Sequence, residues 1–120
     1  MFLYYNPNPR GKAVGDCVVR ALSKALQVPW ETAYAMVTAE GYIQCDMPSA
    51  NAVWGAVLSK AGLDRHLAED GMTAGDFAKL NPDGVYVLAL SGHVVCVVDG
   101  TIYDTWDSSA EIVIYFWEAD

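Results

Sequence analysis

The hydrophobic pattern of the chain changes its period near residue 84, and no other feature constrains the fold as strongly. Before that point, apolar residues recur at helical intervals. After it, Val85–Leu90 and His93–Val98 are continuous apolar runs typical of strands, separated by a tight-turn sequence, Ser91-Gly92. Helices followed by strands predict an α+β domain, with N-terminal helices packed on a C-terminal antiparallel β-meander.

The first helix is predicted to begin at Cys17. Asp16 precedes it, and aspartate is a favourable N-cap because its carboxylate accepts hydrogen bonds from the amides of the first turn. Arg20 and Lys24 share the face opposite the apolar stripe, which predicts that both point away from the core. Cys17 lies at the edge of that stripe, which consists of Val18, Leu22, Ala25 and Leu26.

The other elements follow from the same patterns and from their turn residues. Asp64–Gly71 is polar and is expected to be a solvated loop. No repeat or linker interrupts residues 1–120, a length typical of one domain, so we expect a single domain. The remaining predicted elements are an edge strand at Phe2–Tyr5, helices from Pro29 to Gly41, over about Ser49–Ala61 and after an N-cap at Thr73, and strands at Thr101–Trp106 and Ile112–Trp117.

The charge of the chain argues against several kinds of partner. Fifteen acidic and seven basic side chains give a net charge of −8, which repels phosphate groups, so we expect no nucleic-acid or membrane partner. No apolar run approaches the ~20 residues that span a bilayer. Met1–Tyr5 lacks the basic start and long apolar stretch of a secretory signal, which predicts a cytoplasmic protein.

The cysteines and histidines form no framework that would indicate a disulfide scaffold or a metal site. Cys17, Cys45 and Cys96 are odd in number and include no Cys-x-x-Cys pair, which favours a reducing compartment. His66 and His93 are far apart in the sequence. We therefore expect no metal and no cofactor.

Three distant residues nevertheless form a candidate catalytic group. Cys17 is expected at a helix N-terminus, where free amides and the helix dipole favour a thiolate. If the strands on either side of the turn at 99–100 pair, the numbers of two residues that face each other add up to roughly 199. Asp104 then becomes a diagonal neighbour of His93 on the same face of the sheet. A carboxylate there can orient the imidazole. Cys96 faces the other way and is expected in the core.

The order of these residues resembles that of papain-like cysteine peptidases. Asp104-Thr105-Trp106 is similar to the Asn-Ser-Trp segment of that superfamily, and a Gly92-His93 strand followed by an acid is similar to bacteriocin-processing peptidases. Nearly the whole chain also resembles a group of small proteins encoded by bacteriophages and prophages. The segments that carry this second resemblance are Asn8-Pro9-Arg10-Gly11-Lys12, Gly15-Asp16-Cys17, Gly84-Val85-Tyr86 and Tyr103-Asp104-Thr105-Trp106-Asp107.

These resemblances imply a papain-like fold and a thiol hydrolase, either a peptidase or amidase, or an acyltransferase. The enzyme would act on a protein or peptide substrate in the cytoplasm of an infected or lysogenic bacterium. Cys17 would be the nucleophile, His93 the general base and then the acid, and Asp104 the orienting residue. Trp106 would pack in the core or shield the bond between His93 and Asp104.

The chain departs from the papain-like pattern at the oxyanion donor. Those enzymes place a glutamine six residues before the nucleophile, and here that position is Gly11. Asn8 and Asn6 are the candidate replacements, with the amide of Cys17 as a second donor.

Two other interpretations remain open from the sequence. The missing glutamine fits a papain-like module that binds a host protein without catalysis. In a small structural protein, Cys17, His93 and Asp104 would only support the fold, because cysteine is often a buried apolar residue. The sequence carries no signal for an oligomeric state.

Overall fold

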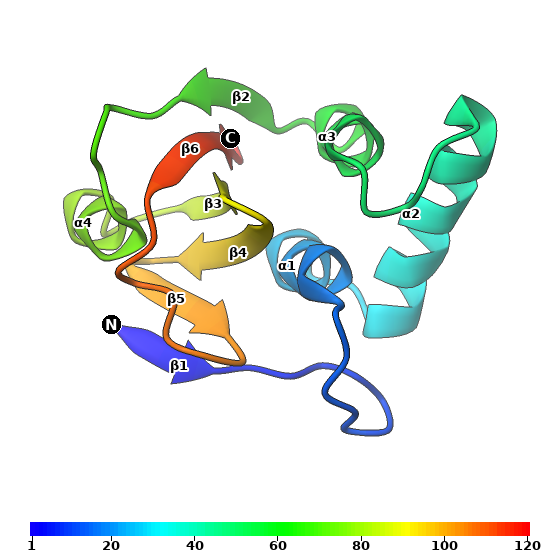
Figure 1. Cartoon of the computed structure of the whole chain (residues 1–120), viewed down its shortest axis with the longest axis horizontal. Helices are drawn as coiled ribbons and strands as arrows, with labels where there is room; N and C mark the ends of the chain where they lie inside the picture. The colour runs from blue at the N-terminus through cyan, green and yellow to red at the C-terminus, as the bar shows by residue number, and fades with distance from the viewer.

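Six strands form one mixed sheet, and four helices pack around it (Figure 1). The computed structural model describes residues 1–120 and confirms the predicted α+β class. In chain order the elements are β1 (Phe2–Tyr4), α1 (Cys17–Leu26), α2 (Trp30–Gln44), α3 (Asn51–Lys60), β2 (Asp64–Leu67), α4 (Ala74–Leu80), β3 (Val85–Leu90), β4 (His93–Val98), β5 (Thr101–Asp104) and β6 (Val113–Glu118).

The sheet differs from the predicted meander. Its strand order is β1-β5-β4-β3-β6-β2, so β3, β4 and β5 are consecutive antiparallel neighbours as expected. β6 and β2 also pair antiparallel, but the prediction of a meander is wrong for β6, which does not lie beside β5, and the edge strand β1 is parallel rather than antiparallel. Because β1 runs parallel to β5 and occupies its free edge, β6 cannot continue the meander there and pairs with β3 instead.

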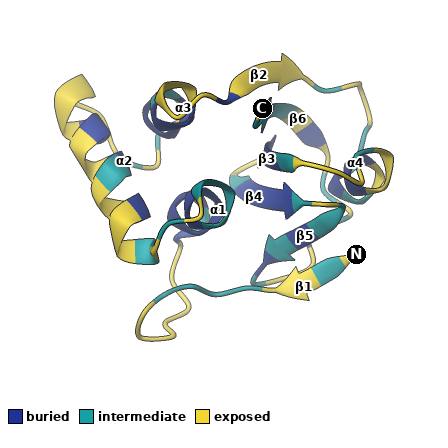
Figure 2. Ribbon diagram, turned by 180° about the vertical axis from the view of Figure 1, so that it is seen from behind, coloured by how far each residue is buried: buried dark blue, intermediate teal, exposed yellow.

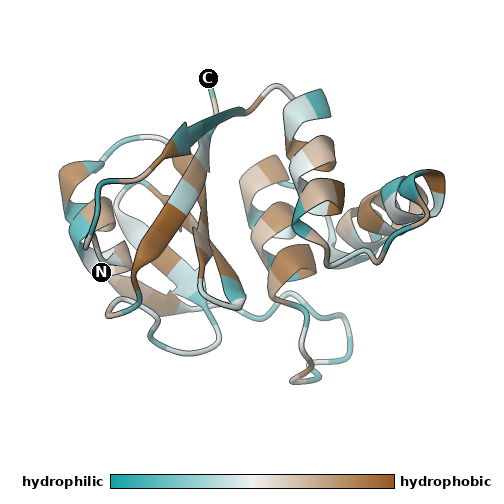
Figure 3. Ribbon diagram, turned by 45° about the horizontal axis from the view of Figure 1, so that its top comes forward, coloured by the Kyte–Doolittle hydropathy of each residue, from teal (hydrophilic) through white to brown (hydrophobic).

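Side chains of the central strands alternate between two hydrophobic cores. On β4, Val94 and Cys96 face the core closed by α1, α2 and α3, as expected for Cys96. Val95 and Val97 face a second core, which α4 closes. α1 therefore packs on one face of the sheet and α4 on the other, as Figure 3 shows, while α2 packs mainly on α1 and α3. In Figure 2 most of the surface of α2 is exposed.

α2 is longer than predicted. It continues past Gly41 and ends at Gln44, and the capping residue Cys45 has a left-handed φ of 54°. The glycine permits a close approach rather than ending the helix, because a Cβ at position 41 would lie 2.8 Å from the carbonyl oxygen of Asp46. The Asp46 amide donates to the Gly41 carbonyl at 2.9 Å, so the chain folds back over this glycine.

The region 64–71, expected to be a solvated loop, begins with a strand. β2 pairs with β6, and all four of its residues are exposed. Arg65 lies over the ring of Tyr115 at 4.2 Å, and His66 stacks on Phe116 at 5.3 Å. A polar strand shows no apolar alternation, so its pairing depends on the neighbouring strand rather than on its own pattern.

The helix ends follow local rules. α4 begins as predicted, because Thr73 Oγ1 accepts a hydrogen bond from the Asp76 amide at 3.0 Å. α2 is the longest helix, with 15 residues. None of the four combines the length and the apolar character that crossing a bilayer requires.

Candidate active site

Cys17 is the first residue of α1, as predicted. The amides of the first turn have no acceptor within the helix, and together with the helix dipole they favour a negative sulfur. α1 packs on β4, whose first residue is His93. The two side chains consequently line one pocket of about 290 Å³.

The surroundings of this pair favour a thiolate beside an imidazolium. Burial alone would raise the pKa of the Cys17 thiol, but hydrogen bonding to His93 and to the Val94 backbone, with the charges of His93 and Arg20, lowers that pKa below its ordinary value. Burial alone would lower the pKa of His93, but hydrogen bonds to Asp104 and Cys17, and their charges, raise it to about 9. Both shifts therefore favour the form in which the proton lies on the imidazole and the sulfur is a thiolate.

The predicted register about the 99–100 turn is confirmed. Cys96 pairs with Tyr103 and Val97 with Ile102, so opposite positions sum to 199. His93 Nε2 lies 2.7 Å from Asp104 Oδ2, and it must donate, because an ionised carboxylate only accepts. Since Nε2 is held by the carboxylate, Nδ1 is the ring nitrogen left for the thiol.

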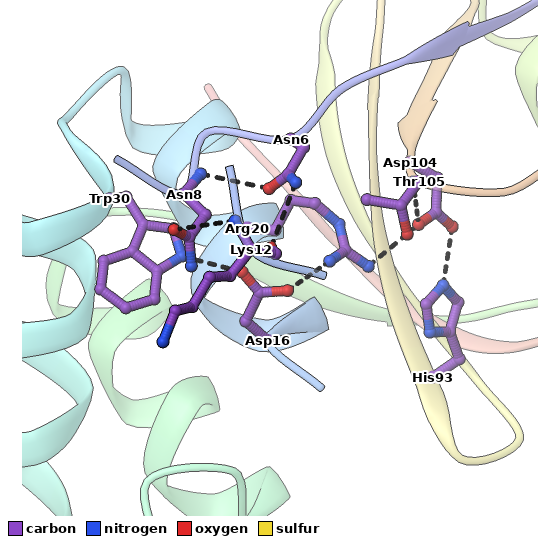
Figure 4. A network of polar contacts seen from close by, with 9 residues as sticks. All are labelled: Asn6, Asn8, Lys12, Asp16, Arg20, Trp30, His93, Asp104 and Thr105. Carbon is purple, nitrogen blue, oxygen red and sulfur yellow. Dashed lines mark hydrogen bonds and ion pairs between the residues drawn. The ribbon is translucent and has the colours of Figure 1, made fainter. Parts of the chain in front are cut away.

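The Asp104 carboxylate is fully buried and accepts four hydrogen bonds, three of which are drawn in Figure 4. Oδ1 accepts from Arg20 Nη2 at 3.0 Å and from the Thr105 amide at 2.8 Å. Oδ2 accepts from His93 Nε2 and from Ser108 Oγ, which lies 2.8 Å away. A carboxylate has about four acceptor positions, so all of them are used. Burial alone would raise the pKa of Asp104, but hydrogen bonds from His93, Ser108 and Thr105 and the charge of His93 lower it.

The prediction that Arg20 points away from the core is wrong. Arg20 is only 4% exposed, and it bridges two carboxylates: Nη1 donates to Asp16 Oδ1 at 2.5 Å and Nη2 donates to Asp104 Oδ1 at 3.0 Å. Because Arg20 follows Cys17 by one helical turn, this bridge ties the helix that carries the thiol to the strand that carries Asp104. Asp16 lies four residues before Arg20, so helical spacing alone indicates that pair. Asp104 lies 84 residues away, and no local pattern indicates it.

Asp16 occupies the N-cap position of α1, but the predicted capping hydrogen bonds are absent. Its Oδ1 accepts from Arg20, and its Oδ2 accepts from Trp30 Nε1 at 2.9 Å. A buried guanidinium without an acceptor costs more free energy than a helix amide without one. The Asp16 carboxylate therefore pairs with Arg20 rather than with the first-turn amides. The first-turn amides beside Cys17 therefore have no side-chain cap.

Residues just after Asp104 complete the site. The ring centres of Trp106 and His93 are 4.8 Å apart, and Trp106 is 45% exposed, so it covers the imidazole at the surface rather than packing in the core. Ser108 is fully buried against the carboxylate, a role that the sequence analysis missed. Asp107 is exposed and does not join the cluster.

Asn6 and Asn8, the candidate oxyanion donors, organise the loop before α1 (Figure 4). Asn8 Oδ1 accepts from the amides of Arg10 and Lys12 at 2.9 and 3.3 Å, and Asn6 Nδ2 donates to the Lys12 carbonyl at 3.2 Å. Neither asparagine lines either of the two described pockets that contain Cys17. The backbone of Val94 hydrogen-bonds to the Cys17 thiol, and the first-turn amides of α1 have no side-chain cap.

The remaining thiols lie apart from this site. Cys45 is exposed at the end of α2, and Cys96 is buried, where desolvation raises its pKa to about 12. No group of three metal-ligating side chains is arranged to hold an ion. Comparison with models of protein families, with curated proteins and with solved structures finds no match.

Proposed function

We propose that this chain is a papain-like thiol hydrolase, a peptidase or amidase, or an acyltransferase that forms the same covalent intermediate. The observation that carries the proposal is the buried carboxylate of Asp104, which holds His93 Nε2 while His93 and Cys17 line one pocket. A nucleophile, a base and a group that orients the base are the parts that acyl transfer through a thiol requires.

The papain-like assignment is supported by how the elements carry these residues. The thiol begins a helix that packs on the sheet, the histidine begins β4, and the acid ends the adjacent strand β5. The resemblance to phage and prophage proteins supports action in a bacterial cytoplasm, on a protein or peptide substrate.

The reaction would begin with the thiolate of Cys17 attacking a carbonyl carbon. A C–S bond forms, and the electron pair of the C=O bond moves to oxygen, where amides of the first turn of α1 would donate to the oxyanion. When the carbonyl re-forms, the leaving amine takes the proton from His93 and an acyl-enzyme remains. His93 then accepts a proton from water as the water oxygen forms a C–O bond to the acyl carbon. When the carbonyl re-forms, the C–S bond breaks, and a carboxylic acid and the Cys17 thiolate result. A different acceptor in place of water gives acyl transfer.

Alkylation with iodoacetamide across pH 5–10 tests the activated thiol, with Cys45 in the same chain as the exposed reference thiol. We expect Cys17 to react well below pH 8.5 in the wild type and to lose that reactivity in His93→Ala, because the imidazole holds the proton. If Cys17 reacts no faster than Cys45 at pH 6, and His93→Ala changes nothing, the proposal is wrong.

A second candidate is a papain-like module that binds a host protein without catalysis. The observation that favours it is that neither Asn6 nor Asn8 lines a described pocket that contains Cys17, so the oxyanion donors expected from the sequence do not lie at the thiol. Loss of one oxyanion donor typically lowers the rate by about 10²–10³.

Capture of host proteins by the wild type and by Cys17→Ala separates the two functions. Equal capture and an equal effect on the host would support binding alone. Equal capture with loss of the effect in Cys17→Ala would support catalysis.

A further inference from the structure

Cys17 also lines a second pocket, on the side of α1 that faces α2. This pocket has a volume of about 270 Å³ and lies between the start of α1, α2 and the segment 48–49. Cys17, Val18 and Ser49 line both this pocket and the one that contains His93. The two pockets therefore meet at the thiol, and a substrate bound at Cys17 has room on either side of the attacked carbon.

The walls of the second pocket are apolar and carry no free charge. Asp16 is the single charged residue that lines it, and both of its carboxylate oxygens are engaged, by Arg20 and by Trp30. The volume lies just below the range of about 300–1,000 Å³ typical of pockets for whole small molecules, which suits one side chain or a short acyl chain. The apolar walls are formed by Val14, Val18, Trp30, Tyr34, Val37 and Pro48.

The aromatic wall of this pocket is held in place by contacts within the protein. The rings of Trp30 and Tyr34 stack with their centres 5.0 Å apart, and Trp30 Nε1 is held by Asp16. Asp16 is in turn held by Arg20, which is buried. A wall that is already ordered loses little conformational entropy when a ligand binds.

The position of His93 decides which part of a substrate this pocket receives. The leaving group takes its proton from the imidazole, so it must lie in the pocket that His93 lines. The group on the other side of the attacked carbon belongs to the acyl portion, and the apolar pocket is on that side of Cys17.

We infer that the substrate is an acyl compound, such as a peptide, with an uncharged apolar side chain on the acyl side, and that this side chain binds between α1 and α2. The inference rests on the proposed function for its orientation. Tyr34 is then a specificity-determining residue.

The preference for an apolar side chain can be tested in the intact chain with N-acetyl-leucyl chloromethyl ketone and N-acetyl-asparaginyl chloromethyl ketone. The two compounds are similar in size, and both are uncharged. In each reaction the thiolate forms a C–S bond to the methylene carbon and chloride leaves. Mass spectrometry of the peptides reports the rates at Cys17 and, as an internal reference, at the exposed Cys45. We expect the leucyl-to-asparaginyl rate ratio to be at least about tenfold higher at Cys17 than at Cys45.

Matched variants locate the effect on α2. Tyr34 and Tyr42 are both exposed on this helix, but Tyr42 does not line the pocket. Tyr34→Ala should reduce the ratio at Cys17 severalfold, and Tyr42→Ala should leave it unchanged. Val14→Asn, in the exposed loop wall, should also reduce it and is a second variant with little risk to folding.

The outcomes distinguish this inference from the proposed function. Equal ratios at Cys17 and Cys45, or equal effects of the two tyrosine variants, would overturn the inference even if iodoacetamide reacts fast at Cys17. Slow reaction of iodoacetamide at Cys17 with a retained leucyl preference would overturn the proposed function and leave an apolar binding pocket.

Discussion

Arg20 Nη2 lies 3.0 Å from Asp104 Oδ1 and joins two parts of the chain that are 84 residues apart. Both side chains are buried, and the same guanidinium also pairs with Asp16. The thiol-bearing helix and the strand that carries the orienting carboxylate are thus held by one side chain. The geometry of the candidate site therefore depends on a residue that touches neither the thiol nor the imidazole in the described hydrogen bonds.

Replacing Arg20 should destabilise the protein strongly. Arg20→Met leaves two buried carboxylates without their cation, and removal of one partner from a buried ion pair typically costs about 3–5 kcal/mol. Urea unfolding measures the loss. Lys79→Met removes an exposed lysine that takes part in none of the described ion pairs, and it should lower the unfolding midpoint much less. Equal midpoints for the two variants would contradict the role of Arg20.

Replacing Asp104 should remove the activation of the thiol. Asp104→Asn loses the negative charge that raises the pKa of His93 and offers fewer acceptor positions to Arg20, so we expect alkylation of Cys17 at pH 6 to fall at least about tenfold. Asp107→Asn is the matched control, because Asp107 is exposed and outside the cluster. An equal rate for both variants would count against Asp104.

The contribution of His93 to stability should depend on pH in a defined direction. Its pKa is raised from 6.5 to about 9, so protonation favours the folded state. The stabilisation is complete below pH 6.5 and is lost as the pH rises through about 9. Cys17 contributes in the opposite sense, because its lowered pKa gives stability above 9.0 that is lost as the pH falls through the folded value.

We therefore expect His93→Gln to lower the free energy of unfolding most at pH 6 and progressively less toward pH 10. Urea unfolding of the variant and the wild type at several pH values measures this difference. A cost that stays constant from pH 6 to pH 10 would show that the histidine is not protonated preferentially in the folded state.

Gly41 should tolerate no side chain. In Gly41→Ala the new Cβ would lie 2.8 Å from the Asp46 carbonyl oxygen, and relief of such a contact moves backbone at a typical cost of about 1–3 kcal/mol. Thermal unfolding measures the loss. Gly15→Ala is the control, because nothing lies within 4 Å of its Cβ position, and a larger loss there would refute the close-approach explanation.

Much of the candidate site could be predicted because it depends on local rules. The helix start at Cys17 follows from the apolar stripe and the preceding loop. The proximity of His93 and Asp104 follows from one turn, because a hairpin turn fixes the register and the register fixes which side chains share a face. Cys96 lies in the core for the same reason.

The errors fall where long-range packing overrides a local preference. Asp16 has the sequence of an N-cap, but the buried guanidinium of Arg20 takes its carboxylate. The polar residues of β2 show no strand pattern of their own, because this edge strand forms through its backbone pairing with β6. The strand order could not be foreseen because β1 and β6 have no local signal for which edge they join.

The sequence by itself determined the α+β class, the four helices, the hairpin register and the order of thiol, imidazole and carboxylate, since each depends on periodicity and turns within a few residues. Only the tertiary structure decided that α1 and α4 cover opposite faces of the sheet, that Arg20 is buried between two acids and that an apolar pocket adjoins the thiol. These features need contacts between distant segments, and the energy of a buried charge or a pocket wall depends on every group that surrounds it.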